Sequence, residues 1–459
     1  MAAVPKTKLS RYGGWLPSAN IHKSFLDYHT KLASERLKKY RTTHPNLPRS
    51  GHLPGGAEGP YVPSVQAFAD AINANPVMGD LFDQILLQAS PMKEVVSFDE
   101  LLFMLDGIVV KPPPFHRPEG EGEGEPIGVP IYLMLDLLIN TSAAYDLFRM
   151  DEFNVAIKAL LKSWGDYLAD TNPLPPLPPS NSSLNSGPDG WFSERGLLYI
   201  EAYLSPLTFK QTYYCPDPSA DNLGFRSWDE FFVREFQRGV RPVDEPGNNS
   251  LIHNACESTV YNKAEKVKLH DQFWLKDQKY SLYDMFGVEG NAYAEKFVDG
   301  TVYQAFLSPA DYHRWHSPVN GTVLDAFVIP GTYYAALPDA GADADDPERD
   351  QGDPHGALIR SQGWLTVAAA RAVIFIQAEE PIGLMCFIGV GMVEVSTCQL
   401  LVKQGDVVEK GTQLGMFHFG GSTHTLIFGP HIKVTWADVI QKDTHHWINS
   451  IIGKAELVQ

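Results

Sequence analysis

The chain has 459 residues, which is enough for a large buried core and, since single cores stop growing at roughly 250–300 residues, for two domains. Its 55 acidic residues outnumber its 37 basic residues, and the formal net charge of −18 opposes binding to nucleic acid or to anionic lipid headgroups. The composition therefore predicts a soluble protein and excludes a nucleic-acid-binding function.

Cysteine usage and apolar runs predict a cytoplasmic location. The four cysteines form no CxxC pair and are sparse for the length, as in intracellular chains with reduced thiols. Residues 1–20 lack the apolar stretch of a secretory signal. The longest apolar runs, Gly383 to Val393 and Ile131 to Ile139, are shorter than the about 20 residues that a membrane-spanning helix needs. We therefore expect no integral membrane contact.

The apolar residues from about 60 to 170 recur with a helical period. Val65, Phe68 and Ile72 share one stripe, and a second stripe runs from Phe153 to Leu168. A low-complexity insert, Lys111 to Pro130, interrupts this half. Its Pro, Gly and Glu residues favour a mobile loop, since such a composition does not bury apolar surface.

A second breaker, Thr171 to Gly190, combines Pro-rich and Ser/Asn/Gly-rich pieces and is typical of a linker between domains. Beyond it, Ser227 and Glu230 form the sequence pattern of a capping box at the start of a helix. The apolar residues Phe231, Phe232 and Phe236 follow, and we expect them to belong to that helix.

From Leu251 onward, short β-branched and aromatic runs alternate with turn residues. The clearest predicted strands are Thr301–Leu307, Gly321–Ile329, Ala372–Gln377 and Gly383–Cys398. The predicted fold class is α+β, an N-terminal helical domain followed by a β-rich domain. Its parts are an N-terminal extension at 1–59, the helical domain with its insert and linker at 60–190, and the β-rich domain at 191–459.

The stretch Asp339 to Asp353 is acidic and contains glycine, but it lacks the ligand spacing of an EF-hand loop and its terminal Glu. We interpret it as a solvated loop rather than a calcium site.

The segment Gly405 to Thr425, GDVVEKGTQLGMFHFGGSTHT, carries the first chemical signal. Two short strands joined by a Lys-Gly turn run into Gly420–Thr423, which places Ser422 just past a strand end. The two glycines before Ser422 permit backbone geometry that is closed to other residues, which matters if the preceding bond is attacked. GGST also occurs in flexible loops, so its meaning depends on the rest of the chain.

A second segment, residues 307–321 (LSPADYHRWHSPVNG), holds His313 and His316 between a predicted strand and a Pro-Asn-Gly turn. Histidine is the usual proton shuttle near neutral pH, although such a pair can also merely hydrogen-bond a turn. The HxxH spacing and the lack of a clear third ligand argue against zinc, and we predict no metal. His445 and His446 lack a partner pattern and are interpreted as surface residues.

Three motifs, in order along the chain, resemble those of the phosphatidylserine decarboxylase family. LSPADYHRWHSPVNG looks like its histidine motif, Phe231 to Asp244 is similar to its arginine-bearing helix, and KGTQLGMFHFGGST resembles its processing motif. The N-terminal helical half is similar to the extra domain of the soluble fungal aromatic-amino-acid decarboxylases. Two departures, Gly420 in place of Leu and Ala255–Ser258 in place of an Asp-Gly pair, also point to that branch.

The resemblance implies a zymogen that cleaves itself between Gly421 and Ser422. In the family scheme a base, here His316, takes the proton of Ser422 Oγ, which attacks the Gly421 carbonyl and forms an ester. Elimination across Cα–Cβ of Ser422 then releases Gly421, and hydrolysis of the resulting enamine leaves a pyruvoyl group. Glu257 stands where the family has a carboxylate that orients the base, but its side chain is one methylene longer.

The resemblance also implies the reaction. A pyruvoyl group derived from Ser422 takes the place of pyridoxal phosphate as the electron sink, and His313 or His316 returns the proton after carbon dioxide leaves. The fragments are residues 1–421 and a 38-residue C-terminal chain, 422–459, which we expect to stay associated. The expected substrate is a free aromatic L-amino acid, tryptophan first, and the alternative is phosphatidylserine.

Two other classes fit less well. The hairpin at 405–419 resembles the fold of biotinyl and lipoyl carriers. Those carriers need an exposed lysine in a Met-Lys-Met turn, which this hairpin lacks. A serine hydrolase needs a G-x-S-x-G elbow, which GGSTHT does not provide.

Overall fold

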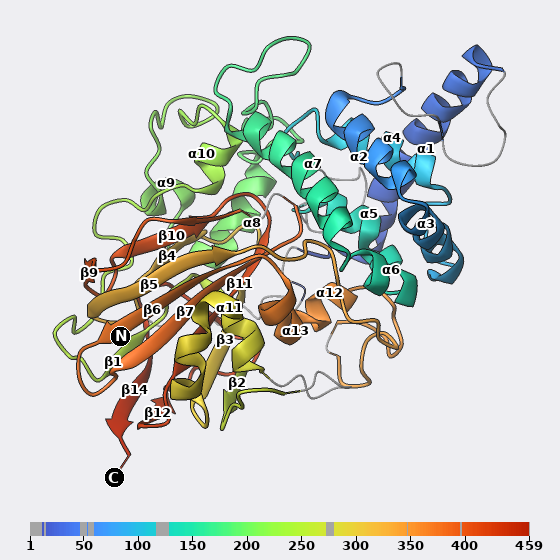
Figure 1. Cartoon of the computed structure of the whole chain (residues 1–459). Helices are drawn as coiled ribbons and strands as arrows, with labels where there is room; N and C mark the ends of the chain where they lie inside the picture. Colours follow the sequence, from blue (N-terminus) through green and yellow to red (C-terminus); the bar gives the residue numbers. More distant parts are fainter. Residues whose placement is uncertain are drawn as a thin grey trace.

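The computed structural model describes residue 12, residues 15–45, residue 53 and residues 59–115, 128–271, 280–346, 348–394 and 397–458. Helices dominate the first half of the chain and strands the second, which confirms the predicted α+β class (Figure 1).

The N-terminal half forms the helices that the apolar period predicts. They are α1 (Ala19–Thr43), α2 (Pro63–Ala74), α3 (Pro76–Gln88), α4 (Phe98–Ile108), α5 (Pro130–Ile139), α6 (Ser142–Leu147) and α7 (Asp151–Ala169). The two predicted stripes are buried, on α2 and on α7, and these helices contact each other. Burial of these apolar stripes, more than intrinsic helix propensity, therefore stabilises the helices of the N-terminal half.

Three short helices follow: α8 (Glu194–Leu204), α9 (Phe209–Thr212) and α10 (Trp228–Phe232). The Ser227 hydroxyl accepts a hydrogen bond from Glu230 N at 3.1 Å, which confirms the predicted cap. The prediction of a complete capping box is wrong, because the Glu230 carboxylate accepts a hydrogen bond from Arg226 N rather than from the backbone N–H of Ser227. The helix is also shorter than expected, and Phe236 lies outside it in a bridge to Tyr213.

The second half builds an antiparallel sheet of eight strands in the order β13-β2-β3-β11-β7-β6-β5-β9, and two three-stranded sheets, β1-β14-β12 and β4-β10-β8. The strands of the large sheet are β2 (Ser258–Glu265), β3 (Thr301–Leu307), β5 (Gly321–Ile329), β6 (Arg371–Ala378), β7 (Leu384–Met392), β9 (Val407–Val408), β11 (Gly421–Phe428) and β13 (His445–His446). The other strands are β1 (Leu251–His253), β4 (Arg314–His316), β8 (Cys398–Leu400), β10 (Gln413–Phe417), β12 (Ile432–Trp436) and β14 (Ile451–Leu457).

Both faces of the large sheet are buried. One face packs with the helical half and with α11 (Leu282–Ala294), the 3₁₀ turn Glu295–Phe297, α12 (Ala357–Arg360) and α13 (Gln362–Ala368), as Figure 1 shows. The other face packs against Trp315 of β4 and its neighbours. We call these the helical face and the inner face. Alternate residues of each strand serve the two faces, so β11 sits between two cores.

The low-complexity insert and the linker were only partly as expected. Residues 116–127 of the insert lie outside the described residues. Phe115, at its near end, is fully buried and packs on Trp191, so this part of the insert does bury apolar surface. The segment 171–190 contains no helix or strand, as a linker would, and the domain bounds stay a prediction.

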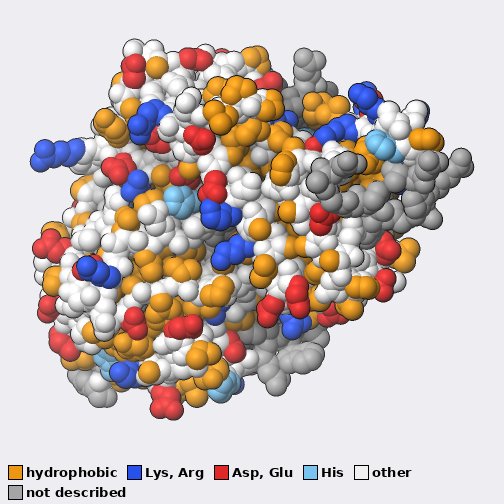
Figure 2. Space-filling view, turned by 45° about the horizontal axis from the view of Figure 1, so that its top comes forward, with side chains coloured by type: hydrophobic (Ala, Val, Ile, Leu, Met, Phe, Trp, Pro, Cys, Tyr) orange, Lys and Arg blue, Asp and Glu red, His pale blue; other side chains and the backbone are white. Residues whose placement is uncertain are grey.

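Within the described residues, no helix is long and apolar enough to cross a membrane. Lysine and arginine side chains are scattered among acidic and apolar ones on the face that Figure 2 shows.

Candidate active site

Ser422 is the second residue of β11, and it lies inside the large sheet rather than in a loop. The sequence analysis predicted that Ser422 lies just past the end of a strand. That strand is β10, which ends at Phe417, and β11 begins at Gly421, one residue before the serine. Gly420, with φ of 153°, provides the bend between the two strands in a region that favours glycine. The serine therefore lies between two paired strands, opposite Leu307 of β3 on one side and Gly391 of β7 on the other.

The side chain of Ser422 faces the inner core. In the antiparallel register Ser422 lies opposite Leu307, and opposite residues project to the same face. Leu307 belongs to the inner face. Ser422 is fully buried, and its Oγ has no hydrogen-bond partner among the described residues. An unsatisfied buried hydroxyl costs about 1–3 kcal/mol, and reactive groups are among the reasons for such an exception.

Gly421 projects to the helical face, where the indole of Trp15 covers it. Gly421 lies opposite Met392, which belongs to that face. A Cβ on Gly421 would lie 1.7 Å from the Trp15 ring, so only glycine fits. Trp15 Nε1 donates a hydrogen bond of 3.0 Å to the carbonyl of Leu307. The N-terminal extension thus covers the predicted cleavage bond.

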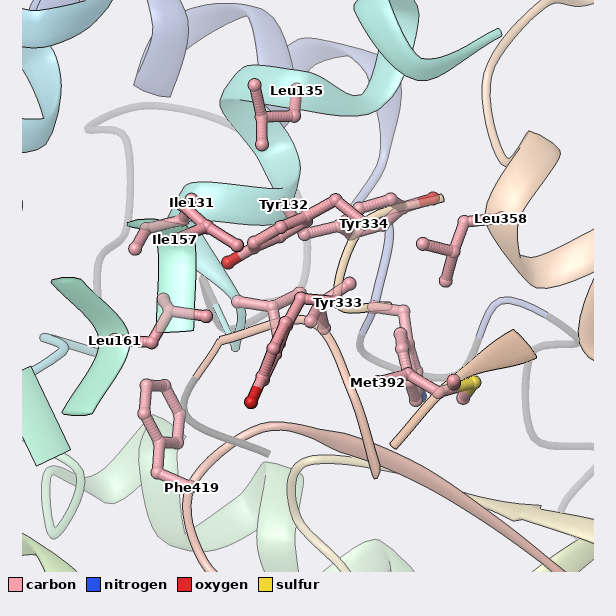
Figure 3. Close-up of a cluster of buried hydrophobic side chains, with 14 of the residues drawn as sticks. Ile131, Tyr132, Leu135, Ile157, Leu161, Tyr333, Tyr334, Leu358, Met392 and Phe419 are labelled. Carbon is pink, nitrogen blue, oxygen red and sulfur yellow. The ribbon is translucent and has the colours of Figure 1, made fainter. Parts of the chain in front are cut away.

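Aromatic and aliphatic side chains surround this covered bond. Tyr132 makes an edge contact with Trp15, with 6.4 Å between ring centroids. Tyr333, Tyr334, Met392 and Phe419 belong to the same buried cluster, which Figure 3 shows between α5, α7 and the sheet. The helical face beside Gly421 is therefore an apolar environment of large, flat side chains.

His313 lies just before β4 and is fully buried. Its ring stacks on Phe232 with 4.0 Å between centroids, and neither ring nitrogen has a hydrogen-bond partner in the described part of the chain. Burial, with a smaller effect of the Arg234 charge, lowers the pKa of His313 well below its usual value. The ring is therefore neutral, with one nitrogen able to accept a proton.

His316 ends β4 and is held at both nitrogens. Nδ1 lies 3.2 Å from Asn449 Oδ1 and Nε2 lies 3.1 Å from the Tyr312 hydroxyl. An amide oxygen only accepts, so Nδ1 carries the proton and Nε2 keeps a lone pair. Burial lowers the pKa of His316 to about 4, and this ring is also neutral. His316 has the protonation state of a general base.

Glu257 does not contact His316, which differs from the direct orientation that the resemblance suggested. Its Oε1 accepts from Arg241 Nη2 at 2.6 Å and from Nε at 2.9 Å, and both side chains are buried. Asn449 Nδ2 donates to the Arg241 carbonyl at 2.8 Å, and Asn449 Oδ1 reaches His316. The Glu257 carboxylate is therefore linked to the His316 imidazole indirectly. Arg241 binds the carboxylate through its guanidinium and Asn449 through its backbone carbonyl, and Asn449 contacts the imidazole.

His445 and His446 are not surface residues, which corrects their interpretation. His445 Nε2 lies 2.8 Å from Asp311 Oδ1, and the Asp311 side chain is fully buried. Asp311 Oδ2 accepts from Ser308 N at 2.7 Å. His446 is buried and contacts Thr444. Asp311 was visible as the acidic residue of the DYHRWH segment, but its partner is 134 residues away and has no local signal.

Like Asp311, Arg234 is a residue that the sequence analysis did not single out, although it lies in the arginine-bearing motif Phe231 to Asp244. It is buried, and its Nη2 donates to the carbonyls of Ala310 (2.6 Å) and Asp311 (3.0 Å). It therefore fixes the turn that precedes His313. The arginine-bearing motif was the available signal.

Ser422, which lacks a partner, and the two neutral imidazoles of His313 and His316 are all buried, but within the described residues neither imidazole is hydrogen-bonded to Ser422 Oγ. Catalytic hydrogen bonds are often long before the reacting complex forms. The chemistry available is attack by a serine hydroxyl on its own preceding carbonyl, and proton transfer by a neutral histidine.

Comparisons with known proteins show that the chain is similar to decarboxylases. A sequence model of phosphatidylserine decarboxylases matches residues 228–446, and a second one of the same description matches residues 62–200. The decarboxylase iboD of Amanita muscaria is 50% identical over 355 residues, which cover 76% of this chain and 99% of that protein.

Two fungal L-tryptophan decarboxylases are also similar. The one from Psilocybe cubensis is 33% identical over 390 residues, covering 83% of this chain and 82% of that protein. The one from Psilocybe cyanescens is 34% identical over 307 residues, covering 65% of this chain and 67% of that protein.

Proposed function

The chain belongs to the phosphatidylserine decarboxylase family, and we propose that it is a pyruvoyl-dependent decarboxylase of a free aromatic L-amino acid, tryptophan first. The observation that carries the proposal is the buried Ser422 Oγ without a partner, directly after a glycine that no larger residue can replace. Names of relatives support the decarboxylase activity, and the geometry supports the residue roles.

The residues at the cleavage bond fit the formation of a pyruvoyl group. Ser422 Oγ attacks the Gly421 carbonyl while a neutral imidazole, His316 Nε2, takes its proton. The C–N bond before Ser422 breaks and a C–O ester bond forms. Loss of the Cα proton of Ser422 expels the Gly421 carboxylate, and water then replaces the nitrogen, which leaves as ammonia. When present, the pyruvoyl carbonyl supplies the electron sink for decarboxylation.

The chain's own residues have the remaining roles. His313 or His316 holds the proton that the product carbon receives, since both rings are buried and neutral. Arg234 holds the turn before His313, and Asn449 fixes the tautomer of His316. Burial of the whole group keeps bulk solvent away from the reacting atoms, so that a single water molecule suffices for the hydrolysis step.

We further propose that the 38-residue fragment 422–459 stays bound after cleavage. It contributes β11 to the middle of the large sheet, where β3 and β7 pair with it on both sides. It also contributes β13 beside β2 and β14 beside β1. Loss of the fragment would expose both cores, which opposes dissociation.

The choice of an aromatic amino acid rests on two observations. Two of the similar proteins are named L-tryptophan decarboxylases. The second is that the chain's own Trp15 indole packs beside Gly421, which supports an environment suited to an aromatic ring next to the predicted cleavage bond. An indole buries about 150–250 Å², which gives a small zwitterion enough apolar contact. Phosphatidylserine is the alternative that the family's name supports.

The first experiment tests processing. Denaturing electrophoresis and intact mass of the purified protein should show chains 1–421 and 422–459, the second with a blocked N-terminus. Ser422→Ala should give one chain of 459 residues. A single full-length chain in active wild-type protein would remove the mechanism.

The second experiment tests the substrate. Carbon dioxide release is measured from equal concentrations of tryptophan, phenylalanine, tyrosine and dispersed phosphatidylserine, without pyridoxal phosphate and with or without phenylhydrazine. Release from tryptophan that phenylhydrazine blocks is the expected result. Turnover of phosphatidylserine alone would overturn the substrate but keep the mechanism. Activity that phenylhydrazine does not affect would exclude a reactive carbonyl.

A further inference from the structure

Three side chains far apart in sequence converge outside the candidate active site. His22 comes from α1, Asp136 from α5 and His355 from the loop before α12. One potential ligand atom of each lies within 4.8 Å of the others. Within the described residues, no hydrogen bond or ion pair joins the three to one another. The three side chains therefore lie close together but do not act as hydrogen-bond partners for one another.

Each histidine is anchored through one nitrogen only. His22 Nε2 lies 2.8 Å from the Leu133 carbonyl, and His355 Nδ1 lies 2.6 Å from Asp353 Oδ1. Both partners are acceptors, so these nitrogens carry the protons. The second nitrogen of each ring, Nδ1 of His22 and Nε2 of His355, is therefore the one that can offer a lone pair to an ion.

Asp136 supplies the independent observation that points to a ligand. It is fully buried, and its Oδ1 accepts from the Tyr132 hydroxyl at 2.8 Å and from Gly356 N at 3.0 Å. Its Oδ2 is buried and has no hydrogen-bond partner in the described part of the chain. A buried carboxylate oxygen without compensation is costly, and charges buried in proteins are paired or coordinate metals.

We propose that His22, Asp136 and His355 bind a divalent transition-metal ion, zinc first, with a fourth coordination position left open. Two imidazoles and a carboxylate suit zinc at about 2.0–2.2 Å. Asp353 beside His355 forms the carboxylate–histidine–metal arrangement that fixes a ligand's tautomer, and the Leu133 carbonyl does the same for His22. The prediction of no metal weighed a zinc site at His313 and His316 and a calcium site in the stretch Asp339 to Asp353, but not these three residues.

The ion would fasten the N-terminal helices to the β-rich part of the chain. Its ligands connect α1 and α5 to the loop that ends the acidic stretch 339–353. Tyr12 already joins the same loop by donating a hydrogen bond of 2.7 Å to Asp346. Tyr12 precedes Trp15, so the site would also hold the segment that covers Gly421. The inference does not depend on the proposed substrate or on cleavage.

The test uses the full-length protein without a histidine tag. Element analysis of the purified protein should find about one zinc per chain. After removal of metal by a chelator, calorimetric titration with zinc chloride should restore one site. Asp136→Asn keeps the size and the Oδ1 contacts but removes the second carboxylate oxygen, and it should weaken zinc binding at least roughly a hundredfold. His44→Gln, at the exposed end of α1, is the matched control and should bind like wild type.

Two more variants protect the test against a folding defect. His355→Gln changes a ligand on the loop and should also abolish the site. Asp353→Asn leaves the three ligands in place and removes the charge beside His355 Nδ1, together with the ion pair to Arg349, and it should weaken zinc binding about 10–100-fold. Cobalt in the wild-type site should give the visible absorption of a four-coordinate ion, which Asp136→Asn should lose. Wild-type protein that neither retains nor binds zinc, or equal zinc binding by wild type, Asp136→Asn and His355→Gln, would overturn the proposal.

Discussion

The indole of Trp15 packs directly on Gly421, and its N–H donates to the carbonyl of Leu307, the residue opposite Ser422 in the sheet. One side chain of the N-terminal extension therefore touches both strands at the predicted cleavage bond. The same contact disfavours a larger residue at Gly421 for a steric reason rather than a backbone one, since Gly421 is not in the left-handed region. The packing around the predicted cleavage bond therefore depends on the N-terminal extension.

The first prediction is that Gly421→Ala slows cleavage and that Trp15→Ala in the same chain restores it in part. The three atoms nearest to an added Cβ all belong to Trp15. Overpacking costs about 1–3 kcal/mol, which corresponds to roughly 5- to 150-fold in rate where the cost falls on the reacting state. The rate is measured as the appearance of the 38-residue fragment.

Two controls accompany this pair. Gly107→Ala introduces a Cβ with no atom within 4 Å and should leave cleavage unchanged. Trp15→Ala alone separates the effect of a lost indole from that of the added methyl group. If the double variant is cleaved no faster than Gly421→Ala, the methyl group acts on the reacting carbonyl and the steric account is wrong.

The sequence predicted regular elements well where a pattern of period two or 3.6 was strong. Strands β3 and β5 have the predicted bounds, and the buried stripe of α7 matches residue by residue. The pattern failed where one contact decides the backbone. The helix after Ser227 ends at Phe232. Two residues later, Arg234 is held by a hydrogen bond from its guanidinium to the Ala310 carbonyl, a long-range contact that has no local sequence signal.

The site was predicted as a set of residues but not as a network. Ser422, His313, His316 and Glu257 are all buried, as reactive groups can be, but no sequence pattern shows that Asn449 stands between Glu257 and His316. His445 was read as exposed because its acceptor, Asp311, is distant in sequence. Long-range polar contacts of this kind depend on tertiary packing, which a single sequence does not reveal.

The second prediction concerns the pH dependence of cleavage. Burial lowers the pKa of His316 to about 4, so the ring stays a base well below its usual range. The rate of cleavage in freshly refolded protein should fall with an acid midpoint near pH 4. A midpoint near pH 6.5, the value of a free imidazole, would show that His316 is solvated in the reacting state or is not the base.

The third prediction concerns the pH dependence of stability. Burial also lowers the pKa values of His253 and His446 to about 4. Between about pH 4 and 6.5 the unfolded chain binds more protons at these histidines than the folded chain, so stability should rise with pH across this window. Urea midpoints of the uncut Ser422→Ala chain measure it. Midpoints that stay constant from pH 6.5 to 4.5 would contradict neutral buried rings.

The fourth prediction is that Asp311→Ala destabilises the uncut chain. The change leaves two buried donors, Ser308 N–H and His445 Nε2, without their acceptor. At about 1–3 kcal/mol for each unsatisfied group, the loss is about 2–6 kcal/mol. Thermal and urea unfolding measure it in the Ser422→Ala background. Glu456→Ala removes an exposed ion pair and should not shift the midpoint measurably. Equal behaviour of the two variants would show that the Asp311 contacts are solvated.

The last prediction separates a direct from an indirect role of Glu257. Among the described residues, the hydrogen bonds between the carboxylate and His316 Nδ1 run through Arg241 and Asn449, so Asn449→Ala should slow cleavage more than Glu257→Gln does. Loss of the single hydrogen bond to His316 Nδ1 is worth about 0.5–1.5 kcal/mol, or up to roughly tenfold in rate. Glu257→Gln keeps an acceptor for Arg241 but loses the charge, and it should slow cleavage without abolishing it.

The double variant decides whether the two residues act through one connection. If they do, Glu257→Gln adds little in the Asn449→Ala background, because the path to His316 is already broken. The readout is the cleavage time course, with Glu257→Asp as the conservative variant that restores the charge. Additive effects would show that Glu257 acts on the site independently of Asn449. Cleavage of Glu257→Gln at the wild-type rate would show that Ser422 and His316 suffice without the carboxylate.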